Sequence, residues 1–153
     1  MFWVSDSREV RKQKIEQLLE NEPALALLLA VFDVEWCIRR AIIALGKTPN
    51  RELREHGLKN CHGLAAYKEL WRCEVAIPRN IVGLSATMPD WNKLKAAFLL
   101  RHKLVHGVEG TTGGRYAFER TCWALESSEE IRDFCLAHGV DLHRRLPVRK
   151  TFR

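Results

Sequence analysis

The chain has 153 residues, of which 46% are hydrophobic and 29% are charged. These values are typical of one globular domain over residues 1–153 and exclude wholesale disorder. Lysine and arginine number 25 against 19 aspartate and glutamate residues, which gives a formal net charge of +6 and is compatible with a polyanionic partner. The basic residues gather on the first predicted helix and in the last ten residues, where each cluster is typical of a solvated surface.

The cysteines and the most apolar run bear on where the protein works. Five cysteines occur, an odd number, with wide spacing and no CxxC pair. With no secretory leader at the first residues, this pattern indicates reduced thiols rather than a disulfide framework. The run PALALLLAVF (23–32) is shorter than the roughly 18–20 apolar residues that a membrane span needs. We therefore expect a cytoplasmic protein that has no membrane partner.

Helical periodicity recurs along the chain without any alternating strand pattern, which predicts an all-α bundle of about five to seven helices. The first helix is expected near SDSRE, where Asp6 and Glu9 resemble a capping box, and should run to about Asn21. The second should begin at Pro23, a favoured first-turn residue, and end before Gly46.

The middle of the chain predicts two further helices and a loop. The sequence TPNRELREHG favours a short helix with Thr48 as its cap and Gly57 at its end. Apolar residues at three- and four-residue spacing predict a longer helix over roughly 61–75. The stretch after it, residues 76–90, contains prolines and a glycine and is expected to form a loop.

The second half begins with an amphipathic helix from about Asp90 to Gly107, with an apolar face that holds Trp91, Leu94, Phe98 and Val105. A glycine-rich loop, GVEGTTGGR, should follow. YAFERTCWAL predicts one helix, and SSEEIRDFCLAHG predicts a separate one with Ser127 and Glu130 as its capping box and Gly139 as its stop. We expect the basic tail at about 140–153 to be partly ordered.

Arg101 falls on the apolar face of the helix predicted over 90–107. A guanidinium at such a place costs desolvation free energy unless an acidic group pairs with it. The most hydrophobic helix, predicted from Pro23, is interrupted by charges that are themselves expected to pair with another charged helix. We therefore expect Glu35 or Asp33 to orient Arg101 or His106.

The stretch RHKLVHG (101–107) has three interpretations. As a helix end, its cations interact favourably with the helix dipole. As a metal site, His102 and His106 share a helix face, but Lys103 replaces the glutamate of the HExxH pattern and no third ligand is near, so we expect no metal. As a catalytic pair, His106 transfers a proton near neutral pH and Arg101 stabilises the developing charge of a phosphate.

The catalytic interpretation carries a geometric condition. Five residues on a regular helix separate two side chains by about 140°. Arg101 and His106 therefore reach one phosphate only if the helix distorts near Gly107, or if two copies of the chain face each other.

Two short motifs resemble those of the HEPN superfamily of small helical proteins. RHKLVH is similar to the R-x4-H motif of its ribonucleases, and EWCIRR places Glu35, Arg39 and Arg40 as E-x3-R-R, similar to the E-x3-K-R element of some members. The resemblance implies a HEPN-like helical homodimer that cleaves RNA without metal or cofactor. Attack by the 2′-hydroxyl would leave a 2′,3′-cyclic phosphate.

The resemblance also implies roles for residues and partners. His106 would be the general acid or base and Arg101 would stabilise the scissile phosphate, with His102 and Glu35 in support. The residues expected to bind RNA are Arg39, Arg40, Lys103 and Arg115. Single-stranded RNA or tRNA would be the substrate of a toxin or of a defence or stress ribonuclease, and a cognate antitoxin would be a further partner.

Two positions depart from the family pattern, and a second function stays open. His102 stands where asparagine is frequent, and Val108 stands where toxins that are modified by AMP carry tyrosine. The alternative is a non-catalytic HEPN-like module that binds RNA, nucleotides or a protein.

Overall fold

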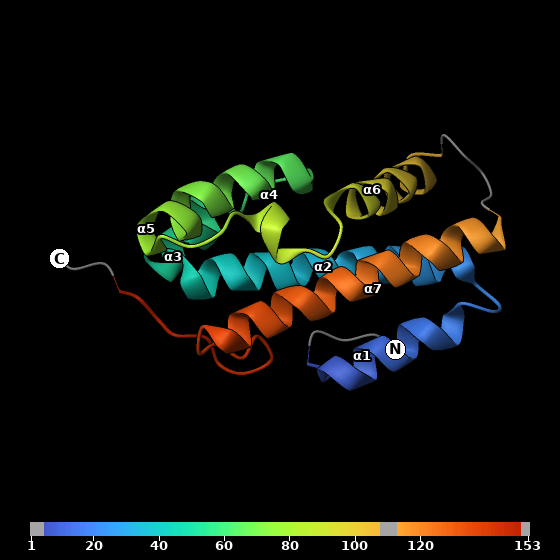
Figure 1. Ribbon diagram of the computed structural model, residues 1–153, viewed down its shortest axis with the longest axis horizontal. Helices are drawn as coiled ribbons and strands as arrows, with labels where there is room; N and C mark the ends of the chain where they lie inside the picture. Colours follow the sequence, from blue (N-terminus) through green and yellow to red (C-terminus); the bar gives the residue numbers. More distant parts are fainter. Residues whose placement is uncertain (1–4, 108–112, 151–153) are drawn as a thin grey trace. The chain divides into compact units, whose positions relative to one another are not determined.

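The computed structural model describes residues 5–107 and 113–150 (Figure 1). Within these ranges the chain is helical and contains no strand, which confirms the predicted all-α class. The chain falls into two compact units, and each combines two separate stretches. Unit 1 comprises Met1–Glu35 and Asp90–Glu129, and unit 2 comprises Trp36–Pro89 and Glu130–Arg153. The single domain expected from the length stays a prediction, and each unit is described by itself.

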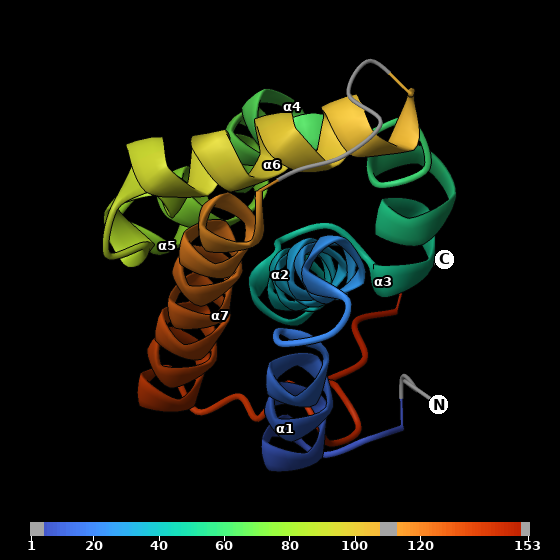
Figure 2. The ribbon, with the colours of Figure 1, turned by 90° about the vertical axis from the view of Figure 1, so that its right-hand side faces the viewer.

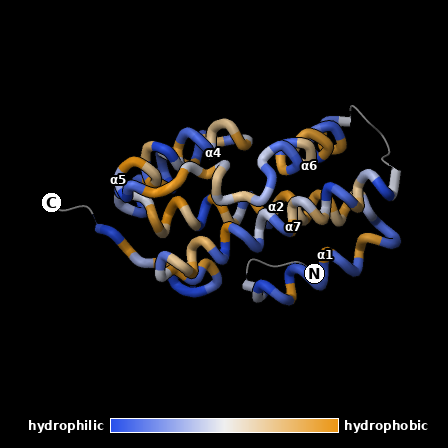
Figure 3. The backbone as a smooth tube through the Cα atoms, viewed as in Figure 1, coloured by the Kyte–Doolittle hydropathy of each residue, from blue (hydrophilic) through white to orange (hydrophobic). Residues whose placement is uncertain are grey.

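The first helix of unit 1 is α1 (Arg8–Leu18), which ends before the predicted Asn21. Its cap is Ser7, whose Oγ accepts a hydrogen bond from the backbone N–H of Val10 at 3.3 Å. The predicted cap, Asp6, is wrong, because its carboxylate instead accepts from Lys14 Nζ at 2.7 Å. The helix is hydrophilic over most of its length, with isolated apolar positions (Figure 3).

Helix α1 packs on α2 (Pro23–Leu45) through a buried ion pair. Helix α2 begins and ends where the sequence predicts. Arg11 Nη1 donates to Asp33 Oδ1 at 2.8 Å, and the two side chains are 0% and 1% exposed. Arg8, on the same helix, pairs with Glu129 of α7 (Gly114–Ala137). The basic face of α1 is thus not the solvated surface that the sequence suggested, because its arginines bind carboxylates of unit 1.

Helix α6 (Trp91–Val105) follows Asp90, whose Oδ1 accepts the backbone N–H groups of Asn92 and Lys93 at 3.0 and 3.1 Å. The buried positions of α6 are Leu94, Ala97 and Leu100. The predicted apolar face is therefore shifted, and Val105 is 55% exposed.

Helix α7 is continuous from Gly114 to Ala137, so the break predicted at Ser127 is wrong. Ser127 is buried, and its Oγ donates to the carbonyl of Trp123, four residues earlier, at 2.9 Å. A serine hydroxyl satisfied in this way does not need to cap a helix. The end of α7 agrees with the prediction, since Gly139 has φ +79°, a conformation that suits glycine.

In unit 2, a short helix α3 (Asn50–Glu52) continues as a π-helical turn over Leu53–Gly57, with the predicted end at Gly57. The predicted cap, Thr48, is wrong, because its backbone N–H and its hydroxyl both donate to the carboxylate of Glu74, each at 3.0 Å.

Helix α4 (Gly63–Trp71) continues as a π-helical turn over Arg72–Ala76 and as α5 (Ile77–Arg79). The helix therefore runs further than the predicted 61–75, and the loop is shorter. The buried Trp71 donates from Nε1 to the carbonyl of Val82 at 3.0 Å, and a 3₁₀ turn forms over Leu84–Thr87. This segment is thus ordered by side-chain contacts.

The C-terminal segment of unit 2 is described up to Lys150 and is held by side-chain hydrogen bonds. Asn50 donates from Nδ2 to the carbonyl of Pro147 at 2.8 Å. The guanidinium of Arg149 donates to the carbonyls of Ile43, Ala44 and Thr48 at 2.6, 3.0 and 3.0 Å. Because the last carbonyls of a helix have no partner within the helix, Arg149 caps the end of α2.

Candidate functional site

The site predicted around Arg101 lies in unit 1, where α6 faces α2. Arg101 Nη2 lies 3.3 Å from Glu35 Oε2, and the two side chains are 36% and 18% exposed. The expectation that Arg101 has an acidic partner is therefore confirmed. The ion pair joins the two short motifs, which lie 66 residues apart in the chain.

The two acidic residues of α2 have different partners. Asp33 and Glu35 are two residues apart, which places them about 200° apart around the helix. Asp33 bonds to Arg11 on α1, whereas Glu35 bonds to Arg101 on α6. Figure 2 looks nearly along α2 and shows α1 and α6 on opposite sides of it. The sequence left Asp33 and Glu35 as alternatives, and this rotation decides for Glu35.

His106 lies at the end of α6, immediately before a left-handed glycine. Its backbone N–H still donates to the carbonyl of His102 at 3.0 Å, and Gly107 then turns the chain with φ +67°. The imidazole rings of His102 and His106 are 4.3 Å apart between centroids, and both residues are exposed. The end of α6 thus presents to solvent a pair of histidines whose rings are in contact and tilted by 50° to each other.

The structure brings together Arg101 with Glu35, and His102 with His106, as two separate pairs. His106 keeps the helical hydrogen bond to His102, so the helix does not bend between Arg101 and His106. The helix ends at Val105, His106 is its cap, and Gly107 turns the chain after it. A site shared by Arg101 and His106, from one chain or from two copies that face each other, stays a prediction.

Two of the arginines predicted to bind RNA, Arg39 and Arg40, make contacts inside unit 2. Arg39 donates to the hydroxyl of Tyr67 at 3.2 Å and to the carbonyl of Leu58 at 3.1 Å. Arg40 donates to the carbonyls of Leu142 and Arg144 at 2.6 and 2.7 Å. These contacts favour a structural role, in which the two guanidiniums fix neighbouring segments to α2.

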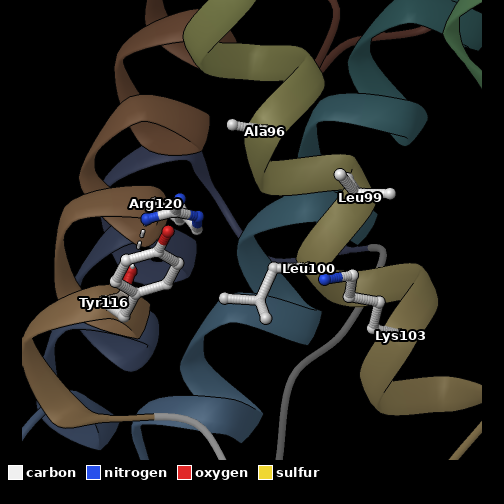
Figure 4. Close-up of a pocket in the computed structure, with 6 residues that line it drawn as sticks. All are labelled: Ala96, Leu99, Leu100, Lys103, Tyr116 and Arg120. Carbon is white, nitrogen blue, oxygen red and sulfur yellow. Dashed lines mark hydrogen bonds between the residues drawn. The ribbon is translucent and has the colours of Figure 1, made fainter. Parts of the chain in front are cut away.

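The other two, Lys103 and Arg115, lie in unit 1. Arg115 is 93% exposed in its side chain and pairs with Glu119, one turn along α7, at 3.2 Å. Lys103 lines a pocket of about 280 Å³ between α6 and α7, drawn in Figure 4. Sequence reasoning missed Tyr116 and Arg120 in this pocket, although their i, i+4 spacing on a helix would have suggested a contact.

Metal binding finds no further support in the described residues. Within 5–107 and 113–150, no group of three or more histidine, cysteine, aspartate or glutamate side chains is placed to hold a metal ion. His102 and His106 therefore have no third protein ligand in this part of the chain. The helices of the same ranges include none that is long and apolar enough to cross a membrane.

Residues 108–112 lie outside the described residues. They include Val108, the position of the tyrosine that is modified in some toxins, and most of the predicted glycine-rich loop.

Comparison of the chain with protein-family models, curated proteins and solved structures finds no match. A function is therefore inferred from the residues of the site alone.

Proposed function

We propose that the chain is a metal-independent endoribonuclease of the HEPN type, in which Arg101 and His106 act on the scissile phosphate. The observation that carries the proposal is the ion pair between Arg101 and Glu35. It links the R-x4-H element to the E-x3-R-R element, which resembles the E-x3-K-R element that accompanies the R-x4-H motif in some HEPN nucleases.

Glu35 is suited to orient Arg101 without occupying the whole guanidinium. A guanidinium has five N–H donors in a planar fork, and the contact at 3.3 Å engages one amino group. Arg101 remains 36% exposed in its side chain, so a ligand can approach it, and four N–H donors are not used by this contact. Two of them suffice for a bidentate contact with phosphate oxygens.

His106 is suited to proton transfer, because imidazole is a common general acid or base and this ring is exposed at the end of α6. In the proposed reaction the 2′-oxygen bonds to phosphorus and the bond from phosphorus to the 5′-oxygen breaks. The imidazole of one His106 takes the proton of the 2′-hydroxyl, and the imidazolium of His106 from the second copy gives a proton to the leaving 5′-oxygen. The products are a 2′,3′-cyclic phosphate and a 5′-hydroxyl. His102, whose ring lies in tilted contact with that of His106, would hold the His106 ring in place.

The proposal includes a homodimer. Because Arg101 and His106 point to different sides of α6, Arg101 of one copy would act with His106 of the other. An exposed apolar residue in the last turn of α6, Val105 at 55%, supports an interface at this end of the helix. The net charge of +6 suits RNA, such as tRNA, and a toxin or defence ribonuclease would have an antitoxin as partner.

The test is cleavage of fluorescently labelled RNA in excess EDTA, with the 3′ ends of the products identified by mass spectrometry. We expect cyclic-phosphate ends from the wild type, and a loss of about a hundredfold or more in rate for Arg101→Ala and for His106→Ala. Glu35→Gln should lower the rate less, because Arg101 is retained. His56→Ala is the matched control, since His56 is an exposed histidine of unit 2. Wild-type rates in either the Arg101 or the His106 variant refute the assignment.

The second candidate function is a non-catalytic module that binds RNA. It is favoured by the placement of Arg101 and His106 in two separate pairs within one chain. A protein that remains monomeric and binds RNA without cutting it would establish this alternative.

A further inference from the structure

The pocket between α6 and α7 is lined by apolar and basic side chains. Its lining consists of Ala96, Leu99, Leu100, Lys103, Tyr116 and Arg120 and contains no acidic residue. In Figure 4, Tyr116 and Arg120 project from α7 on one side, and Leu99 and Lys103 belong to α6 on the other, with Leu100 between them. The pocket therefore combines an aromatic ring, an aliphatic surface and two cations.

Arg120 is held in place by an aromatic ring instead of a carboxylate. Its Cζ lies 3.5 Å from the ring centroid of Tyr116, and its Nη1 donates to the Tyr116 carbonyl at 3.4 Å. The other four arginines of unit 1 that the structure describes each pair with a carboxylate: Arg8, Arg11, Arg101 and Arg115. Arg120 is thus a preoriented cation whose charge no acidic side chain of the described residues neutralises.

The apolar surface of the pocket is exposed. Tyr116 is 56% exposed and Leu99 is 57% exposed. A volume of about 280 Å³ lies at the lower end of the range for small-molecule sites, which fits one nucleotide unit better than a larger ligand. Nucleobases stack on aromatic side chains, and basic side chains beside them bind the adjoining phosphate.

We propose that this pocket binds one nucleotide of single-stranded RNA, with the base against Tyr116 and Leu99 and the phosphate at Arg120 and Lys103. Lys103 precedes His106 by three residues, about one turn of α6, so the RNA would continue from the pocket toward the histidine pair. The subsite rests on the proposed ribonuclease for its substrate, but its binding of RNA is measurable without cleavage.

The experiment measures the binding of fluorescein-labelled octauridylate by fluorescence anisotropy, with the His106→Ala protein so that cleavage does not intervene. Tyr116→Ala should weaken binding by about tenfold, the effect expected from the loss of one stacked base, and Tyr116→Phe should retain the affinity. Arg120→Gln should weaken binding and lower the slope of log Kd against log salt concentration by about 0.7, because one phosphate contact is lost.

Two variants serve as matched controls. Phe118→Ala removes an aromatic residue of α7 that is 51% exposed and does not line the pocket. Arg51→Gln removes one positive charge from a side chain that is 84% exposed in unit 2. The Phe118 control should bind as the parent does, and the Arg51 control should retain its salt slope. Circular dichroism establishes that each variant is folded.

The outcomes separate this proposal from the ribonuclease. Loss of binding in the Tyr116→Ala and Arg120→Gln proteins, with a wild type that does not cut RNA, supports the subsite and refutes the nuclease. Cleavage by the wild type with unchanged binding in both variants refutes the subsite and leaves the nuclease. No binding of octauridylate by the parent protein at low salt also overturns the subsite, and an acidic peptide would then be the ligand class to examine.

Discussion

The ion pair between Arg11 and Asp33 offers a sharp test of how α1 is held on α2. Both side chains are almost completely buried, with the bonding atoms 2.8 Å apart. Asp33→Asn keeps the size of the side chain but removes the charge that neutralises the guanidinium. Arg11→Met keeps the length of the side chain and leaves the carboxylate buried without this cation.

The expected magnitudes follow from the burial. Breaking a buried ion pair by the removal of one charge costs about 3–5 kcal/mol, whereas replacement of both partners by apolar residues is close to neutral or stabilising. We expect each single variant to lose about 3 kcal/mol of unfolding free energy, and the Arg11→Met/Asp33→Leu double variant to recover most of it. A loss of 3 kcal/mol is a large part of the total stability of a small domain, which is about 5–15 kcal/mol.

The assay is urea unfolding followed by circular dichroism at 222 nm, with Asp33→Leu measured as a further single variant so that it forms a double-mutant cycle with Arg11→Met and the double variant. The control is the exposed pair of Lys12 and Glu16, which are 4.0 Å apart and 47% and 50% exposed. Alanine at either position should change the unfolding free energy by less than about 0.5 kcal/mol. Single variants of Arg11 and Asp33 that cost less than about 1 kcal/mol, or a double variant as unstable as the singles, would refute the reasoning.

Two further predictions concern unit 2. Arg149→Gln should lower the unfolding free energy, measured by thermal unfolding, by about 1–3 kcal/mol, because the carbonyls at the end of α2 lose a charged donor. Arg144→Gln is the control and should leave the unfolding free energy unchanged, since the Arg144 side chain is 84% exposed. Equal stability of the two variants would contradict the capping role. Burial raises the pKa of the Cys135 thiol to about 12, so iodoacetamide at pH 8 should alkylate Cys135 only after unfolding. The unfolded thiol loses its proton near pH 9 and the folded one near pH 12, so the unfolding free energy of the wild type should fall as the pH rises over this interval. The fall should be smaller in Cys135→Ala, which has no thiol at this position. Rapid alkylation of the native thiol at pH 8 would contradict the burial.

The helix ends that the sequence predicted correctly are those marked by residues with strong backbone preferences. Pro23 and Gly46 bracket α2, and Gly139 ends the segment after α7, because proline fixes its own φ and glycine adopts conformations that other residues avoid, in any surroundings. The helix caps predicted at serine and threonine were wrong, because the hydroxyls of these residues bond to other groups. Ser127 bonds within α7 and Thr48 bonds to Glu74, contacts that depend on the fold.

The same distinction applies to the site. That Arg101 needs an acidic partner was predictable, because a guanidinium on an apolar face is costly unless it is paired. The choice between Asp33 and Glu35 was not, since it depends on the rotation of α2 between its neighbours. The pocket with Arg120 was also not predictable, because two of its sides belong to different helices.

During synthesis, the C-terminal end of α2 cannot gain its hydrogen bonds from Arg149 until almost the whole chain has been made. Arg149 bonds to the carbonyl of Ile43, which was synthesised 106 residues earlier. At the roughly 5–20 residues per second of translation, this interval is on the order of 5 to 20 s. Both compact units draw on a stretch from each half of the chain, so neither is complete while the first half alone has left the ribosome. The apolar helix α2 therefore spends that time as a nascent segment that a chaperone can bind.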